Sequence, residues 1–231
     1  ELFSLNLFLK IEILLFFSYY IVCCKNMYFC IIKQKNYKMK KLVFLISAFI
    51  LMSFSTTHQE HVSVNTQAST VKWIGSKMTE SHNGDIKIKS GKLVLDHGKL
   101  AGGEFVIDMT TINTLDMSEK YNDKLNSHLS NEDFFNVEKF PTAELKITSL
   151  QMINRTKYEI TADLTIKGIT HSITFEADVN IKGNSYLATA NFKIDRTKWG
   201  VVYNSGNFFE DLGDYLIKDE IEFDIYLLSV K

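Results

Sequence analysis

Apolar and polar residues alternate over much of the chain beyond residue 70, and this period of two predicts β-strands with one buried face. The alternation is clearest in one run of five apolar residues, each followed by a polar or charged neighbour: Ile173, Phe175, Ala177, Val179 and Ile181. The same pattern recurs in long runs at 158–166, 188–194 and 221–227, and in shorter ones at 71–73, 86–88, 93–95, 105–109 and 145–147. We therefore expect eight or nine strands.

Short turn signals separate these runs, at Asn83-Gly84, Ser90-Gly91, Asp96-His97-Gly98, Lys167-Gly168 and Lys182-Gly183-Asn184. Long strands joined by short turns form an antiparallel meander, which can hide its edges by closing. The expected fold class is all-β, an antiparallel, lipocalin-like barrel of about eight strands. Alanines on the apolar faces, at positions 162, 177, 188 and 190, favour a cavity in the lumen over a packed core.

One segment, Asp116–Ser130, breaks the alternation. Met117, Tyr121 and Leu125 follow each other at four-residue spacing, which predicts a short helix lying across one barrel end. Thr114 or Asp116 is the candidate N-cap. The apolar stripe fits two interpretations, a helix that only packs on the core and a lid that contacts a ligand.

The connector after this helix carries the adjacent residues Phe134 and Phe135 and the only proline of the chain. Aromatic residues in a short acidic connector between strands are typical of a mouth or lid. We therefore expect Phe134 and Phe135 at the barrel mouth.

The N-terminal part differs in composition from the rest. Lysines precede the apolar run 42–52, and Ser53 and Ser55 follow it, which predicts a signal peptide at 39–55. That run is shorter than the roughly 20 residues of a membrane-spanning helix. Residues 1–38 are expected to be a non-native upstream extension, or else an extra leader or anchor. We expect a flexible lead-in at 56–69 and one folded domain at 70–231.

Removing the N-terminal part changes the charge balance. Residues 1–55 hold seven of the 26 basic and two of the 27 acidic residues, which leaves 19 against 25 and a net charge of −6. A mildly acidic domain has no electrostatic footprint for nucleic acid. All three cysteines precede residue 31, so the folded domain has neither a disulfide nor a thiol nucleophile.

Ordered sequence blocks then point to a family. They are Trp73 with His82-Asn83-Gly84, Gly103–Met109 with Thr111-Ile112, Leu129–Thr142, Leu164–Thr170, Ile194–Arg196 with Trp199-Gly200, and Gly213-Asp214 with Ile217–Asp224. Each block is weak alone, but their order and spacing cover nearly the whole domain. In these blocks the chain resembles the YceI-like family of secreted bacterial proteins.

The resemblance implies a barrel that holds a polyisoprenoid or similar amphiphilic lipid, in the periplasm or outside the cell, with no catalysis and no other cofactor. It also implies a mature domain that does not span a membrane. The oligomeric state is open, a homodimer included. From polarity alone, the residues expected to line the lumen are Phe105, Ile107, Leu164, Phe175, Phe192 and Phe223.

Arg196 and Lys198, beside Trp199, are the candidates for contact with an anionic lipid head group. In the alternative interpretation, Arg196 pairs with Asp195 or Asp214 and pins a long loop to the barrel.

Metal and catalytic motifs are weak. The acidic cluster within 210–220 lacks the spacing of an EF-hand loop, the histidines lack zinc-site spacing, and no nucleophile elbow occurs. No catalytic or metal-binding residue is assigned. Two alternatives to a lipid carrier stay open, namely a barrel enzyme acting on small lipophilic molecules and a ligand-free barrel acting through protein contacts.

Overall fold

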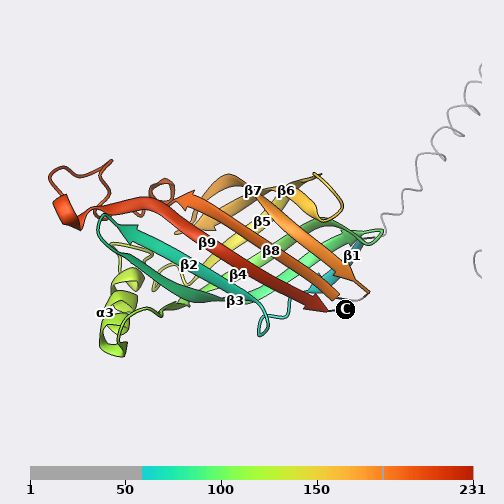
Figure 1. The fold of residues 1–231 in the computed structure, drawn as a ribbon, viewed down its shortest axis with the longest axis horizontal. Helices are drawn as coiled ribbons and strands as arrows, with labels where there is room; N and C mark the ends of the chain where they lie inside the picture. The colour runs from blue at the N-terminus through green and yellow to red at the C-terminus, as the bar shows by residue number, and fades with distance from the viewer. Residues whose placement is uncertain (1–58, 184, 231) are drawn as a thin grey trace, which may run out of the picture. The chain divides into compact units, whose positions relative to one another are not determined.

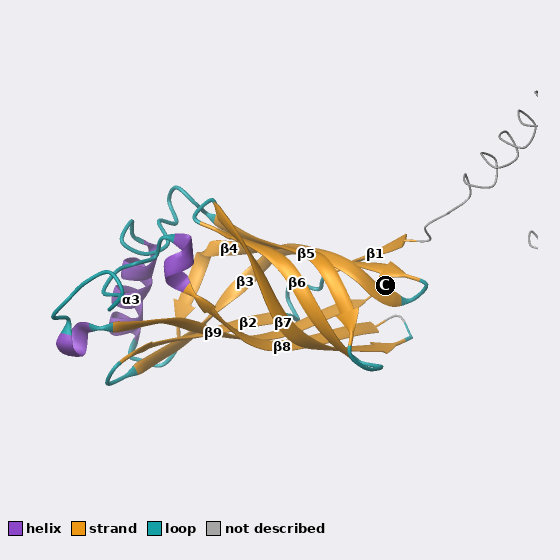
Figure 2. Ribbon diagram, turned by 90° about the horizontal axis from the view of Figure 1, so that it is seen from above, coloured by secondary structure: helices purple, strands orange, loops and turns teal. Residues whose placement is uncertain are grey.

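Long antiparallel strands account for most of the residues that the computed structural model describes, which are 59–183 and 185–230. Figures 1 and 2 show these strands winding around a common long axis, with α3 at one end. In chain order the elements are β1 (Gln59–Ser63), β2 (Thr70–Lys77), β3 (Ser81–Asp96), β4 (Lys99–Thr114), α3 (Glu119–Ser130), β5 (Thr142–Met152), β6 (Lys157–Ile166), β7 (Ile169–Lys182), β8 (Ser185–Asp195), the short 3₁₀ helices η1 (Arg196–Trp199) and η2 (Gly213–Tyr215), and β9 (Ile217–Val230).

Strands β2 to β9 form a closed meander. Each pairs antiparallel with the next, and β2 returns to β9 with Thr70 opposite Tyr226. β1 and β2 share one edge of β3, since Gln59 lies opposite Asp96 and Val71 lies opposite Ile86. The barrel therefore has eight strand positions, and the predicted all-β, antiparallel barrel with one helix at its end is confirmed.

The alternation decides which face of each strand is buried. In β6, the side chains of Tyr158, Ile160, Ala162, Leu164 and Ile166 are all buried, whereas none of the residues between them is. Burial of apolar area stabilises a fold by about 25 cal/mol per Å². The closed ladder lets every strand place its apolar face inward without leaving an open edge.

Three of the predicted turns connect neighbouring strands in β-hairpins. His97 and Gly98 have φ angles of 50° and 75°, and Lys167 and Gly168 have the same pair of values. Positive φ at both central residues is typical of the type I′ turns that match the twist of antiparallel strands. The third turn joins Lys182, the end of β7, to Ser185, the start of β8.

Two predicted turns, Asn83-Gly84 and Ser90-Gly91, were wrong, because both lie inside β3. The two strands expected around 86–88 and 93–95 are therefore one. A Cβ atom at Gly84 would lie 2.5 Å from the ring of Trp73, and one at Gly91 would lie 2.9 Å from Phe105. Glycine marks a close approach of neighbours here rather than a turn.

The predicted flexible lead-in at 56–69 also needs correction. Its described part begins with β1, which pairs with β3 over five residues. Val62 and Val64 are buried, so this segment belongs to the barrel wall and its apolar core. The predicted signal peptide at 39–55 and the extension at 1–38 lie outside the described residues.

Helix α3 begins three residues later than predicted, and neither expected residue caps it. The N-cap position is Ser118, which makes no side-chain cap hydrogen bond. Asn126 of the helix instead accepts hydrogen bonds from the backbone N–H and the hydroxyl of Thr114, at 2.8 and 2.7 Å. The helix is thus tied to the end of β4. Over residues 59–183 and 185–230, no helix combines the length and apolar character needed to cross a membrane.

Candidate functional site

A cavity of about 260 Å³ lies in the lumen of the barrel, and every strand from β2 to β9 contributes to its lining. The six residues predicted to line the lumen all lie on this surface: Phe105, Ile107, Leu164, Phe175, Phe192 and Phe223. The lining contains no Asp or Glu side chain among the described residues. The cavity is therefore suited to an apolar guest.

Aromatic rings form one wall of the cavity. Phe175 of β7 stacks on Phe192 of β8 with ring centroids 4.4 Å apart, and Phe192 lies 5.7 Å from Phe223 of β9. Further along the same strands, Ala177 lies opposite Ala190. These small side chains leave the space that larger ones would fill, in agreement with the cavity expected from the alanines.

The connection from α3 to β5 covers part of the mouth end of the barrel. Phe134 and Phe135, the predicted mouth residues, both line the cavity. The ring of Phe134 is buried, and it lies 4.9 Å from the ring of His128 and 5.3 Å from that of Tyr203. Phe134 is therefore a packed part of this cover.

The loop after β8 covers the adjoining part of the mouth end. The Trp199 indole is almost fully buried and donates a hydrogen bond to the Leu164 carbonyl at 3.0 Å. His171 of β7 contacts the Lys198 carbonyl oxygen through Nε2, at 2.9 Å. The Lys198 side chain itself is exposed and does not line the cavity.

Arg196, the other head-group candidate, is buried beneath this loop. Its guanidinium donates to the carbonyls of Val201 at 2.6 Å, Ile217 at 3.1 Å and Lys218 at 3.2 Å, and it lies 3.4 Å from Asp219. Burial lowers the pKa of this guanidinium below its usual value, against the opposing effect of nearby carboxylates. Four of its five N–H donors are thus engaged, three of them with β9 and one with the Val201 carbonyl of the loop itself.

This arrangement matches the second interpretation of Arg196, with a different acid as partner. The acidic partner is Asp219 rather than Asp195 or Asp214, because β9 brings Asp219 beneath the loop. Arg196 lies in the lining of the cavity and Lys198 does not, so the two do not form a cationic pair there.

At the mouth end, the lining of the cavity also includes polar and cationic residues from β2, β3 and β9, namely Ser76, Lys77, His82 and Lys218. We call these four residues the polar rim. They come from three strands. Their proximity could not be predicted from the sequence, because polar residues are common near turns and do not by themselves indicate a site. In the sequence His82 belongs to the family block with Trp73, but no pattern there assigned it to a site.

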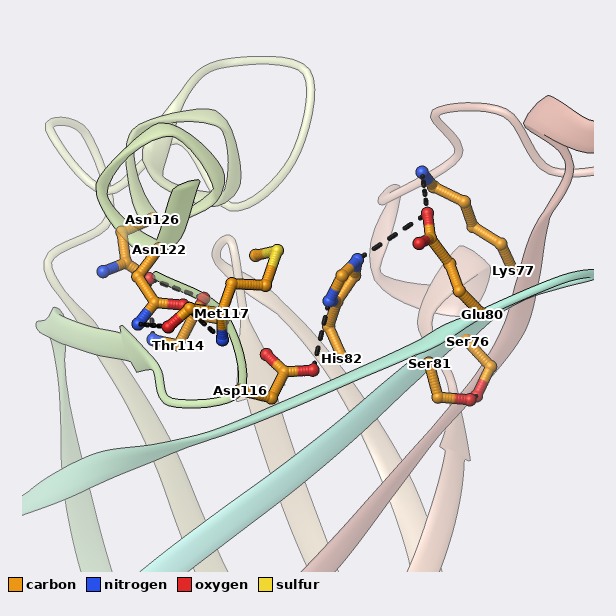
Figure 3. A network of polar contacts seen from close by, with 10 residues as sticks. All are labelled: Ser76, Lys77, Glu80, Ser81, His82, Thr114, Asp116, Met117, Asn122 and Asn126. Carbon is orange, nitrogen blue, oxygen red and sulfur yellow. Dashed lines mark hydrogen bonds and ion pairs between the residues drawn. The ribbon is translucent and has the colours of Figure 1, made fainter. Parts of the chain in front are cut away.

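Figure 3 shows how His82 is held in the rim. Its Nδ1 lies 3.2 Å from a carboxylate oxygen of Asp116, in the connection that leads to α3, and its Nε2 lies 3.8 Å from Glu80. Lys77 donates to Glu80 at 2.9 Å. The hydrogen bond and charge of Lys77, with the charge of His82, hold the pKa of Glu80 below its usual 4.5.

Over 59–183 and 185–230, no group of three or more His, Cys, Asp or Glu side chains is placed to hold a metal ion. The polar rim offers hydrogen-bond donors and cationic groups at the edge of an otherwise apolar cavity.

The fold agrees with comparisons to known proteins. The sequence profile of the YceI-like domain matches residues 62–228. The chain belongs to the YceI-like family. A UPF0312 protein of Shewanella denitrificans is 33% identical over 87 residues, which is 38% of this chain and 44% of that protein. The chain thus spans less than half of the length of this curated relative.

Solved structures similar to this YceI-like chain share its fold. BcnA of Burkholderia cenocepacia superposes with a TM-score of 0.59 at 21% identity, over 71% of this chain and 98% of that one. A domain from Saccharophagus degradans described as polyisoprenoid-binding gives a TM-score of 0.54 at 14% identity, over 74% and 97% of the two chains.

Proposed function

We propose that this YceI-like chain is a secreted or periplasmic binding protein that holds a polyisoprenoid or a similar amphiphilic lipid in the barrel lumen, without catalysis. The observation that carries the proposal is the 260 Å³ cavity, whose walls are apolar almost throughout. The similarity in fold to a domain described as polyisoprenoid-binding supports the same ligand class. The location is supported by the signal-like sequence at 39–55.

The size of the cavity limits the length of the buried chain. A water-sized group needs about 10–15 Å³ on this measure of volume, so 260 Å³ accommodates about 20 such groups. That corresponds to roughly four isoprene units. Each buried methylene contributes about 0.8 kcal/mol, so a chain of this length binds tightly without many polar contacts.

The polar rim suits the head group of such a lipid. Ser76, Lys77, His82 and Lys218 lie in the lining at the mouth end, so an amphiphile whose tail fills the lumen can place its polar end among these side chains. An anionic or hydroxyl head group would find hydrogen-bond donors there.

The direct test is native mass spectrometry of the chain purified from its producing cell without added lipid, followed by organic extraction of what it carries. We expect a stoichiometric prenyl or fatty species. A clean apo mass that stays unchanged after incubation with prenyl lipids would refute the proposal and favour a barrel that acts through protein contacts. The variant Ala190→Asp, which places a charge in the lumen, is expected to fold and to lose the bound lipid.

A further inference from the structure

The large apolar side chains that remain exposed are concentrated at the mouth end of the barrel. Among the described residues, the five most exposed are Tyr215 at 75%, Met78 at 63%, Tyr121 at 58%, Phe208 at 57% and Leu115 at 55%. All five lie in α3, in η2 or in connections at that end, which Figure 1 shows as the end holding α3 and η2. With Phe209, which is 48% exposed, we call this set the apolar crown.

The loop that carries Phe208 and Phe209 is anchored, so its aromatic side chains are held outward. The backbone N–H groups of both residues donate to the carbonyl of Ser205 at 3.0 Å, and Ser205 is fully buried. Asn207 donates to Asp219 at 2.7 Å, which ties the loop to β9. Ordered exposure of adjacent aromatic rings marks an interaction surface.

The apolar crown adjoins the polar rim. Met78 directly follows Ser76 and Lys77 of the polar rim, and Leu115 precedes Asp116, the partner of His82. A guest that leaves the cavity on this side therefore meets the crown next. A polyisoprenoid is almost insoluble in water, since each methylene exposed costs about 0.8 kcal/mol, so its exchange calls for a continuous apolar path.

The charges beside the crown restrict the surface that it fits. Glu210, Asp211 and Asp214 are exposed in the same loop as Phe208, Phe209 and Tyr215. Carboxylates attract ammonium groups by their negative charge. The aromatic rings beside them also bind quaternary ammonium ions, by cation–π attraction. The same carboxylates repel an anionic surface.

We propose that the apolar crown docks the mouth of the barrel on a bilayer of zwitterionic phospholipids, whose outermost groups are cationic amines. Lipid then passes between bilayer and cavity without crossing water. This inference rests on the proposed function, because only a carrier of a membrane lipid needs such a surface.

The test places a reporter in the crown and a matched one at the other barrel end. Phe208→Trp reports from the crown, and Ile153→Trp reports from the β5–β6 connection, where Ile153 is 50% exposed. Both variants keep the full chain, so any effect of residues 1–58 is common to them. Vesicles of brominated phosphatidylcholine are expected to quench the added fluorescence of Phe208→Trp and not that of Ile153→Trp.

A second pair of variants measures the strength of docking. Phe208→Ser with Phe209→Ser is expected to lower partition into phosphatidylcholine vesicles about tenfold or more, because two large apolar side chains are lost. Met152→Ser with Ile153→Ser removes similarly exposed side chains at the far end, 45% and 50% exposed, and is expected to change partition less than about twofold. Transfer of a fluorescent prenyl lipid from vesicles should slow only in the first pair.

The outcomes separate this inference from the proposed function. Equal quenching of the two reporters, or none, overturns the docking surface even if the protein carries a prenyl lipid. Stronger binding to phosphatidylglycerol than to phosphatidylcholine overturns the choice of a zwitterionic surface. Quenching at position 208 in a protein that takes up no prenyl lipid refutes the carrier function and leaves the surface in place.

Discussion

The substitution Ala190→Phe tests whether the space in the lumen sets the length of the ligand. Ala190 lines the cavity opposite Ala177, so a phenyl group added there points into empty space. Its about six carbons take up roughly 60–90 Å³ at 10–15 Å³ each. That is about a quarter to a third of the 260 Å³ available.

This loss of volume corresponds to about one isoprene unit. With roughly 0.8 kcal/mol for each of about five carbons that can no longer be buried, the longest fitting ligand loses about 4 kcal/mol, close to a thousandfold in affinity. A ligand one unit shorter should bind nearly as well as before. Folding stability should be unchanged or raised, because the new ring is buried without displacing a neighbour.

The assay is displacement of a fluorescent lipid by farnesol, geranylgeraniol and longer prenyl alcohols, with thermal unfolding measured in parallel. The control is Thr174→Phe, an exposed position on the outer face of β7, which should leave the length preference unchanged. If Ala190→Phe lowered the melting temperature by several degrees and weakened all ligands equally, the lumen at Ala190 would be packed and the reasoning would fail.

Three further predictions concern the parts that shape the mouth and the wall. Arg196→Leu should lower the free energy of unfolding in urea by about 3–5 kcal/mol, because Asp219 and buried carbonyls lose their donor; a loss below about 1 kcal/mol would show that the loop does not depend on it. Gly84→Ala should destabilise the barrel by about 1–3 kcal/mol, because the added Cβ atom clashes with the strand beside it. In the control Gly75→Ala the added Cβ atom meets nothing within 4 Å, so this variant should keep its stability. Equal melting temperatures of the two variants would contradict this prediction. NMR titration should place the pKa of Glu80 below 4.5 and show that this pKa rises in Lys77→Met. Because the pKa is lower in the folded state, the stabilisation by this pair is present above pH 4.5 and is lost as the pH falls through the folded value. An unchanged pKa of Glu80 in the variant would exclude Lys77 as the cause.

Strand periodicity predicted the barrel and the inward direction of its residues, because alternation follows directly from the geometry of a strand. Phe175, Phe192 and Phe223 lie on the cavity lining for this reason. The glycines of β3 led to two wrong turn predictions, because glycine is favoured both in turns and where neighbouring groups approach a strand closely. Strand β1 was missed because it is short and because Val62 is the only buried residue of its five.

The mouth could be predicted only in part. Adjacent phenylalanines in a connector indicated a cover, and Phe134 and Phe135 do lie there. The polar rim joins residues from β2, β3 and β9, and their proximity depends on barrel closure. The environment of Arg196 depends on backbone carbonyls of Ile217 and Lys218 in the distant strand β9. No local pattern encodes contacts of either kind.

Closure of the barrel also sets the order of events in biosynthesis. The seam between β2 and β9 joins Thr70 to Tyr226, nearly the two ends of the described chain. Pairing between such distant segments is a slow, late step of folding. A chain emerging from a ribosome or a translocation pore therefore has no lumen until its last strand is free. Loading with any guest must follow the release of β9, in the compartment where this strand emerges.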